Sequence, residues 1–288
     1  MNMKISFPPA AVFAVAMIVV SAFSISAQEL TPEQLIARHR DSIGTKEALA
    51  GVKNQMVVSD VRCVFKGSTA ILNGKALILS EGDKALWGMS FSSNDYPLEK
   101  FGFDGKDIKV VKPIPSAGRS LLGDFLYSNS AILKGGLLGG TLSYSWALLT
   151  ERKAKMSVDG RKTIDGKSAV ILSYSPKGGS DVSVKMYFDD KTFQHLRTEY
   201  TVVISAAQGS NVNLSASQAN TNYKVTETFS DFAKAGDLTL PKTYKLSYSR
   251  TSSGATSQGG TRDIEYSFSV TNVNFNQELE ASSLKVDG

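Results

Sequence analysis

The chain has 288 residues, of which 42% are hydrophobic, and a formal net charge of +5. Its basic residues alternate with acidic ones instead of forming a cluster, so nucleic-acid binding is not expected. Because Cys63 is the only cysteine, no intramolecular disulfide can form, and core packing with sheet pairing must stabilise the fold. We expect Cys63 itself to be a small buried apolar residue.

Residues 1–27 have the three parts of a secretory signal, which are Lys4, an apolar run from Phe7 to about Val20, and small residues ending at Ala27. A membrane anchor is the alternative, but a run of about 14 residues is short of the roughly 20 that cross a bilayer. We therefore expect cleavage near Ala27 and a periplasmic or secreted protein. Residues 28–288 are expected to form a single domain.

The first predicted helix begins after Thr31, which can cap it, with Pro32 at the first helical position and Gln34 completing a capping box. Its apolar face has helical spacing and comprises Leu35, Ile36, His39 and Ile43. Gly44 is placed to end it, and a second short helical turn over residues 45–50 ends at Gly51.

Alternating apolar residues then predict strands with one buried face. This pattern is formed first by Val57, Val61, Cys63 and Phe65, and then by Ala85, Trp87, Met89 and Phe91. A hairpin over residues 100–113 turns at Asp104-Gly105. Turn signals at Asp159-Gly160, Asp165-Gly166, 177–179 and Asp189-Asp190 separate further strands, expected over 169–174, 182–188, 196–203, 223–229, 242–249 and 263–273. Residues 205–220 and 252–260 are expected to be flexible connections, so the sequence predicts an antiparallel meander.

One segment interrupts the strand pattern. Residues 119–133 have apolar positions with helical spacing and are followed by a glycine-rich sequence around Leu137 and Leu138. The flanking glycines would suit a lid over an apolar cavity. A tight, buried crossing from helix to strand is an equally acceptable interpretation.

No catalytic motif is found in the sequence. The only histidines are His39 and His195, without a Cys/His cluster of metal-ligand spacing, and neither a nucleophile elbow nor a complete phosphate-binding loop is present. Asp189 and Asp190 are interpreted as turn residues, and His195 with Glu199 as a pair on the surface of one strand. We therefore expect no enzyme activity and no cofactor.

What remains is an excess of large apolar residues. A strongly curved antiparallel sheet can enclose more volume than its own side chains fill, and it can then hold an apolar ligand. The candidate residues for lining or closing such a cavity are Trp87, Met89, Phe91, Phe101, Phe103, Leu122, Phe125, Leu137, Leu138 and Trp146.

The order of these elements resembles the LolA/LolB-like family of periplasmic lipoprotein carriers. The likeness rests on the N-terminal helix, the Trp87 strand, the hairpin at 103–106, the apolar helical insertion and the strand end at 187–189. It implies a mainly antiparallel β (α+β) fold, in which a curved sheet forms an incomplete half-barrel that helices close around a hydrophobic cavity. A cavity-mouth arginine of the family has no clear counterpart, since the nearest basic residue is Lys84.

The resemblance implies a carrier or sensor that binds a lipid, an acyl chain or an acylated protein. Membrane proteins of the envelope are further expected partners, and the chain is expected to be a monomer. The alternative is a non-catalytic structural or interaction module of the cell envelope, whose cavity is filled by its own aromatic side chains.

Overall fold

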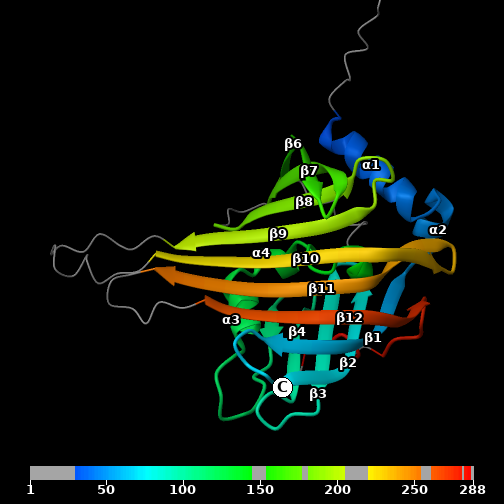
Figure 1. Ribbon diagram of the computed structural model, residues 1–288. Helices are drawn as coiled ribbons and strands as arrows, with labels where there is room; N and C mark the ends of the chain where they lie inside the picture. Colours follow the sequence, from blue (N-terminus) through cyan, green and yellow to red (C-terminus); the bar gives the residue numbers. More distant parts are fainter. Residues whose placement is uncertain are drawn as a thin grey trace, which may run out of the picture.

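The structure is a computed structural model that describes residues 30–144, 154–176, 181–204, 220–253, 261–280 and 282–286. Within these ranges, twelve strands form one antiparallel sheet in the order β5-β4-β3-β2-β1-β12-β11-β10-β9-β8-β7-β6 (Figure 1). The strands are β1 (Asn54–Phe65), β2 (Ile71–Glu81), β3 (Lys84–Phe91), β4 (Leu98–Phe103), β5 (Ile108–Val110), β6 (Lys155–Ile164), β7 (Lys167–Ser175), β8 (Ser183–Asp189), β9 (His195–Ile204), β10 (Asn220–Ala235), β11 (Leu238–Ser253) and β12 (Thr261–Phe275).

The helices are α1 (Pro32–Ile43), α2 (Lys46–Ala50), α3 (Leu121–Ser128), α4 (Ala131–Lys134) and the 3-10 helix η1 (Gly140–Ser143). The N-terminal prediction is confirmed: Thr31 caps α1 and forms both hydrogen bonds of a capping box with Gln34. The predicted helical insertion is present as two helices, since Asn129 caps the end of α3 and α4 begins at Ala131.

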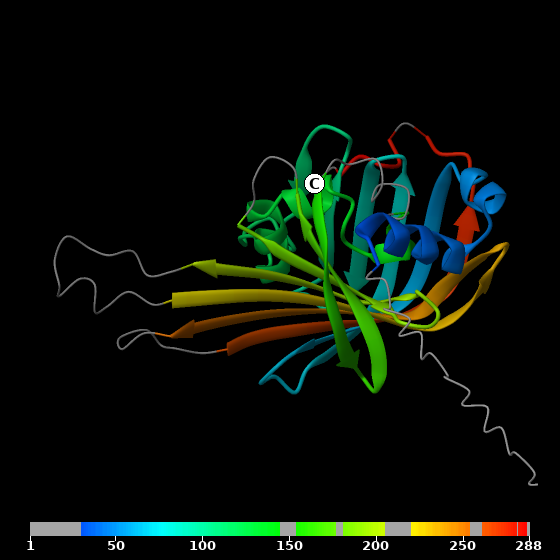
Figure 2. The same cartoon turned by 90° about the horizontal axis from the view of Figure 1, so that it is seen from above.

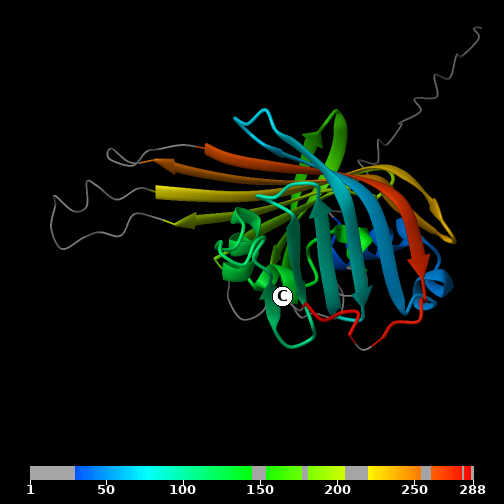
Figure 3. The same cartoon turned by 90° about the horizontal axis from the view of Figure 1, so that it is seen from below.

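The sheet is strongly curved, and its concave face carries the main core. Figures 2 and 3 show α1 and the α3–α4 segment on this same side of the sheet. The predicted alternation is confirmed along β1, where Val57, Val61 and Cys63 are buried toward the helices. Burial also raises the pKa of the Cys63 thiol to about 12, so this cysteine is the small buried residue that the sequence predicts.

A smaller cluster covers part of the opposite, convex face. Leu79 of β2 and Leu86 of β3 pack there against Leu284 and Val286 near the end of the chain. A side chain at Gly102 would lie 2.8 Å from a methyl group of Val286, which shows how closely the C-terminal segment follows the outside of β4. The C-terminal residues therefore seal the outer face of this half of the sheet.

The turn signals have two different outcomes. Asp165-Gly166 forms the predicted hairpin turn, with positive φ at both residues (49° and 80°). Asp159-Gly160 does not form a turn, since both residues lie inside β6, where the pairing with β7 shifts register between Val158 and Arg161. Gly160 has a φ of 95°, so the glycine serves a β-bulge here, which requires the same backbone freedom as a tight turn.

Residues 111–154 connect β5 and β6, the strands at the two edges of the sheet, and the structure describes this connection up to Tyr144 and at Ala154. This connection places α3, α4 and η1 against the concave face (Figure 2), so the segment between the two edges also covers the interior. No helix in the described part of the chain is long and apolar enough to cross a membrane. The predicted signal at 1–27, the turn at 177–179, most of the two long connections and Trp146 lie outside the described residues.

Candidate functional site

Nine of the ten predicted cavity residues lie in the described part of the chain, and all nine belong to one buried cluster on the concave face. Their side chains are between 0% and 7% exposed. The cluster comprises Trp87, Met89, Phe91, Phe101, Phe103, Leu122, Phe125, Leu137 and Leu138. The first five come from β3 and β4, and the other four come from the insertion that covers them.

Trp87 lies at the centre of the contact between strands β3 and β4 and the insertion. Its ring stacks on Phe101, with ring centroids 5.9 Å apart, and meets Tyr244 of β11 at the same separation. A Cβ atom at Gly139 would lie only 2.4 Å from the Trp87 ring. The glycine-rich turn is therefore seated directly on the indole, with no room for a side chain at that position.

The backbone of this turn also requires glycine. Gly139 has a φ of 88° and Gly140 a φ of 51°, in the left-handed region that residues with side chains rarely adopt. A Cβ atom at Gly140 would lie 2.9 Å from both His195 Nδ1 and the ring of Phe229. The predicted freedom of the paired glycines is thus used to bring the main chain against the sheet.

Polar side chains of the sheet hold the same turn. Glu227 of β10 accepts hydrogen bonds from the Gly139 N–H at 2.6 Å and from the hydroxyls of Tyr200 and Tyr244, each at 2.7 Å. The Tyr200 hydroxyl is also 2.9 Å from the Leu137 carbonyl oxygen. Burial raises the pKa of Glu227 to about 7, although all three hydrogen bonds act to lower it.

Gln55 of β1 extends this polar group. Its side-chain nitrogen donates to the Thr141 carbonyl oxygen at 3.0 Å. Its Oε1 atom is buried and has no hydrogen-bond partner among the described residues. We call the four side chains that face the turn the amide cradle, comprising Gln55, Tyr200, Glu227 and Tyr244.

A second buried carboxylate holds the beginning of the insertion. Glu99 of β4 is fully buried and accepts from Ser120 Oγ at 2.9 Å and from the hydroxyl of Tyr96. Ser120 also caps α3 by accepting from the Gly123 N–H. Burial raises the pKa of Glu99 to about 7 against the effect of these bonds, so the insertion meets one buried carboxylate at each end.

Both histidines lie in the core beside the cradle. His39 Nδ1 is 2.9 Å from the Phe193 carbonyl oxygen, and its ring lies 5.9 Å from that of His195. His195 Nε2 contacts Thr198 Oγ1 at 2.8 Å, and its ring packs against Phe229. Burial lowers the pKa of His39 to about 4 and that of His195 to about 3, so both rings are neutral near pH 7.

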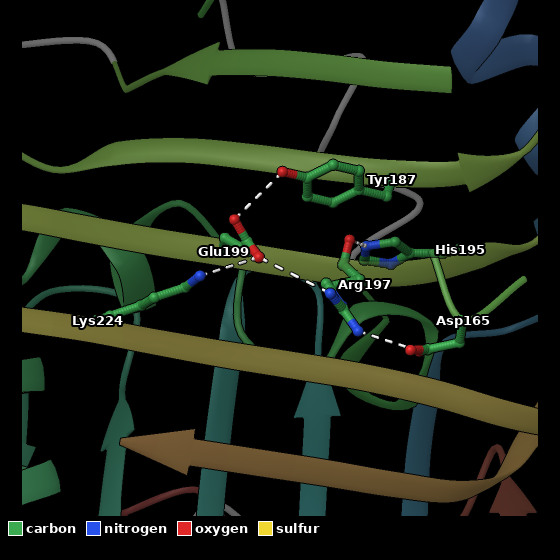
Figure 4. Close-up of polar contacts among 6 residues, drawn as sticks. All are labelled: Asp165, Tyr187, His195, Arg197, Glu199 and Lys224. Carbon is green, nitrogen blue, oxygen red and sulfur yellow. Dashed lines mark hydrogen bonds and ion pairs between the residues drawn. The ribbon is translucent and has the colours of Figure 1, made fainter. Parts of the chain in front are cut away.

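The predicted surface pair of His195 and Glu199 is wrong. The pairing of β8 with β9 shifts register between Tyr187 and Phe188, so that Leu196 is an extra residue in β9. His195 is consequently buried in the concave core, while Glu199 lies on the other face. Figure 4 shows the Glu199 carboxylate between Tyr187, Lys224 and Arg197.

The Asp189-Asp190 prediction is confirmed as a turn. The Asp189 carboxylate accepts from the backbone N–H groups of Lys191 and Thr192, as a turn aspartate does. Asp190 forms an ion pair with Arg161 at 3.0 Å. Each carboxylate is thus explained by local structure.

Two further features of the described residues bear on the site. Within the ranges that it describes, no three His, Cys, Asp or Glu side chains come close enough to hold a metal ion. An open surface cavity of about 900 Å³ lies between α2 and the β10–β11 turn, with Glu47, Lys234 and Phe275 on its walls. None of the predicted cavity residues borders it.

Comparison with solved structures identifies the fold. A LolA superfamily protein from Nitrosomonas europaea aligns over 89% of this chain and 98% of its own, with a TM-score of 0.51 and 13% identity. The chain has a LolA-like fold. This finding confirms the curved half-barrel that the sequence resemblance implies, while the identity is too low to transfer a function.

More distant likenesses to this LolA-like chain are also found. A DUF1329 family protein from Desulfovibrio piger has 9% identity and a TM-score of 0.41, covering 88% of this chain and 97% of its own. An outer membrane lipoprotein-sorting protein domain from Vibrio parahaemolyticus has 11% identity and a TM-score of 0.39, covering 88% and 96%. No family model and no curated protein matches the sequence.

The amide cradle is not among the residues predicted from the sequence. One signal was present for Glu227, because it alternates with Val225 and Phe229 and so occupies an inward position of a predicted strand. A carboxylate at such a position must find buried donors, and the neighbouring strands supply tyrosines. No sequence signal connects these residues to Gly139, since that contact joins residues 88 positions apart.

Proposed function

We propose that this LolA-like chain is a non-enzymatic carrier or sensor of the cell envelope that binds a lipid, an acyl chain or an acylated protein. The ligand would occupy the concave face of the sheet, in the space that residues 121–144 fill in this structure. The signal-like residues 1–27 favour a periplasmic or secreted location. Membrane proteins of the envelope would be the source or the acceptor of the ligand, and the chain would act as a monomer.

One observation carries the proposal. The apolar concave face is covered by a separate insertion, and the sheet does not close over itself. Leu137 and Leu138 at the centre of this cover lie next to left-handed glycines. An apolar surface whose cover is an inserted segment can be exposed by moving that segment, without separating any strand pair.

The test changes both Leu137 and Leu138 to serine. Covering roughly 100 Å² of ligand with these side chains would contribute about 2.5 kcal/mol before the cost of ordering the segment. We therefore expect a fluorescent fatty-acyl probe to bind several-fold more weakly. The loss of ligand-free stability should be modest, because it cannot exceed the free energy of opening the segment.

The matched control is Ile71→Ser, since Ile71 is 49% exposed on β2 and lies outside the site. This variant should bind the probe as the parent does. Unchanged probe affinity in the double-leucine variant would contradict the proposal.

A second candidate is a structural or interaction module of the envelope. It is favoured by the burial of Leu137 and Leu138, which are only 1% and 2% exposed, as a permanent core would require. Under this alternative the double-leucine variant loses as much stability as a core substitution, several kcal/mol. Native mass spectrometry of the purified protein distinguishes the two, because a carrier retains bound lipid and a filled module does not.

A further inference from the structure

The turn at the centre of the concave face presents main-chain amide groups to the sheet, together with apolar side chains. Its Thr141 carbonyl oxygen accepts a hydrogen bond from Gln55, and its Gly139 N–H donates to Glu227. Its Leu137 carbonyl oxygen lies 2.9 Å from the Tyr200 hydroxyl, whose single proton is shared between this oxygen and Glu227. The side chains of Leu137 and Leu138 lie beside these amides in the apolar core. Hydrogen bonds to its main-chain amide groups thus hold this apolar turn against the sheet.

The cradle has a hydrogen-bonding capacity that the turn leaves unused. Gln55 is fully buried, yet its Oε1 atom has no donor among the described residues. An unpaired buried acceptor destabilises the folded state, so a residue whose only role was to hold this turn would be better replaced by one without such an atom. A ligand with a further N–H group would satisfy this atom.

We propose that the amide cradle is a binding site for an amide attached to an apolar chain, and that residues 137–141 occupy this site as an internal substitute. The inference rests on the proposed function and names the ligand class of the same concave site. The ligand N–H would replace that of Gly139 at Glu227. Its apolar chain would lie on the concave core beneath Leu137 and Leu138, which would move outward with the displaced turn and cover the chain.

The chemistry of Glu227 separates an amide from other lipid groups. Its carboxylate already accepts from two tyrosine hydroxyls and takes a third donor, which an amide N–H supplies. An ester has no N–H and would place an oxygen lone pair against the carboxylate. A free fatty acid would add a second negative charge in a buried site, which is costly without a partner cation. N-acylated amino acids and apolar peptides both carry the required amide.

The test compares two ligands that differ in one group. N-decanoylglycinamide has an N–H where O-decanoylglycolamide has an ester oxygen. Both are titrated calorimetrically below their micellar concentrations and at pH 8.5, where Glu227 is ionised. We expect the amide to bind at least about tenfold more tightly, as for a hydrogen bond to a charged acceptor. In Glu227→Gln the ratio should fall toward one, because glutamine can offer a donor to the ester oxygen. The matched control Glu199→Gln, on the opposite face of the neighbouring strand, should keep the parent ratio.

A second variant tests the internal substitute without altering the cradle. Gly139→Ala places a methyl group against the Trp87 ring and strains a backbone with a φ of 88°. It should displace the turn and tighten binding of N-decanoylglycinamide several-fold. An acetylated and amidated Gly-Leu-Leu-Gly-Gly peptide, which copies residues 136–140, tests the peptide source. Binding of either amide compound that is tighter than binding of the ester supports the proposal, and the tighter of the two amide compounds identifies the source.

Two negative results have different meanings. If both decanoyl compounds bind equally to the parent protein, the concave acyl site stands and the amide cradle is refuted. If no decanoyl compound and no peptide binds, even to Gly139→Ala, the proposed function itself fails. A circular dichroism spectrum identical to that of the parent confirms that each variant remains folded.

Discussion

Strands β9 and β10 carry two polar networks on opposite faces, made from the same kinds of side chain. On the concave face, Glu227 accepts from two tyrosines and a backbone N–H, all buried. On the convex face, Glu199 contacts Tyr187 at 3.2 Å and Lys224 at 3.1 Å, with the Lys224 side chain 48% exposed (Figure 4). Glu199 and Tyr200 are neighbours in the chain, so the two networks lie back to back.

The pKa values of the two carboxylates shift in opposite directions. Complete burial raises the pKa of Glu227 to about 7, since its neutral partners compensate for only part of the lost hydration. Partial burial acts to raise the pKa of Glu199 too, but the hydrogen bond and charge of Lys224, helped by Tyr187 and Arg197, outweigh it and lower the pKa. Solvent access and a cation, not the tyrosine contacts, therefore decide how each glutamate behaves.

The largest expected effect comes from removing the buried carboxylate. Glu227→Ala leaves the Tyr244 hydroxyl and the Gly139 N–H without their acceptor in the core, while the Tyr200 hydroxyl keeps only the Leu137 carbonyl oxygen 2.9 Å away. We expect the free energy of unfolding, measured by urea denaturation, to fall by about 4 kcal/mol. A loss below 1 kcal/mol would mean that water or a rearranged turn replaces the carboxylate. It would contradict the claim that Glu227 is the essential acceptor of a buried network.

The next effect is a pH dependence of opposite sign on the two faces. The folded protein keeps the Glu227 proton up to about pH 7, whereas the reference value is 4.5. The stability of the parent relative to Glu227→Gln should therefore fall as pH rises from 4.5 to 7, by at most about 3 kcal/mol. His39, His195 and Glu99 titrate in both proteins and largely cancel in this difference.

Glu199→Gln provides the matched measurement. Because the pKa of Glu199 is lowered in the folded state, its contribution is present above the reference value of 4.5 and is lost as pH falls. The stability of the parent relative to this variant should decrease toward acid pH. Two slopes of the same sign would overturn the assignment of a buried and a solvated carboxylate.

The smallest effect is expected for the cation of the convex network. Lys224→Met removes the ion pair with Glu199 but leaves Arg197 and Tyr187 beside the carboxylate. Because the lysine is about half exposed, the free energy of unfolding should change by about 0.5 kcal/mol or less. Thermal unfolding at low and high salt checks this, since any contribution of the pair should shrink with added salt.

Much of the fold was predictable because the local signals are physical constraints on the backbone. Thr31, Pro32 and Gln34 can satisfy the exposed N–H groups of a helix start, and they do so in the structure. Period-two patterns located β1 and β3, and Asp165-Gly166 located a hairpin turn. The beginning of β2 has lysine, asparagine and glycine on a largely exposed stretch, so it gave no apolar alternation to detect.

Two incorrect predictions, for His195 and for Asp159-Gly160, share one cause, which is the β-bulge. In a regular strand, His195 and Glu199 would point to the same face of the sheet because they are four residues apart. The extra residue Leu196 shifts this alternation, so His195 points to the opposite face from Glu199. In β6, Asp159-Gly160 has the composition of a turn but serves a bulge. The cradle was missed for another reason, since its contacts join β1, β9, β10 and β11 to a distant turn, and only the sheet order brings them together.

The position of β1 beside β12 has a consequence for how the chain folds. The meanders β1–β5 and β6–β12 pair strands that follow one another in sequence, but the contact between β1 and β12 joins residues such as Val58 and Thr271, which are 213 positions apart. Closing such a long loop is slow, so this central seam should be the late step of folding. Until it forms, each meander exposes a strand edge in what becomes the middle of the sheet, where another copy of the chain could pair. Loss of either terminal strand would therefore divide the sheet at its centre and not merely shorten it at the rim.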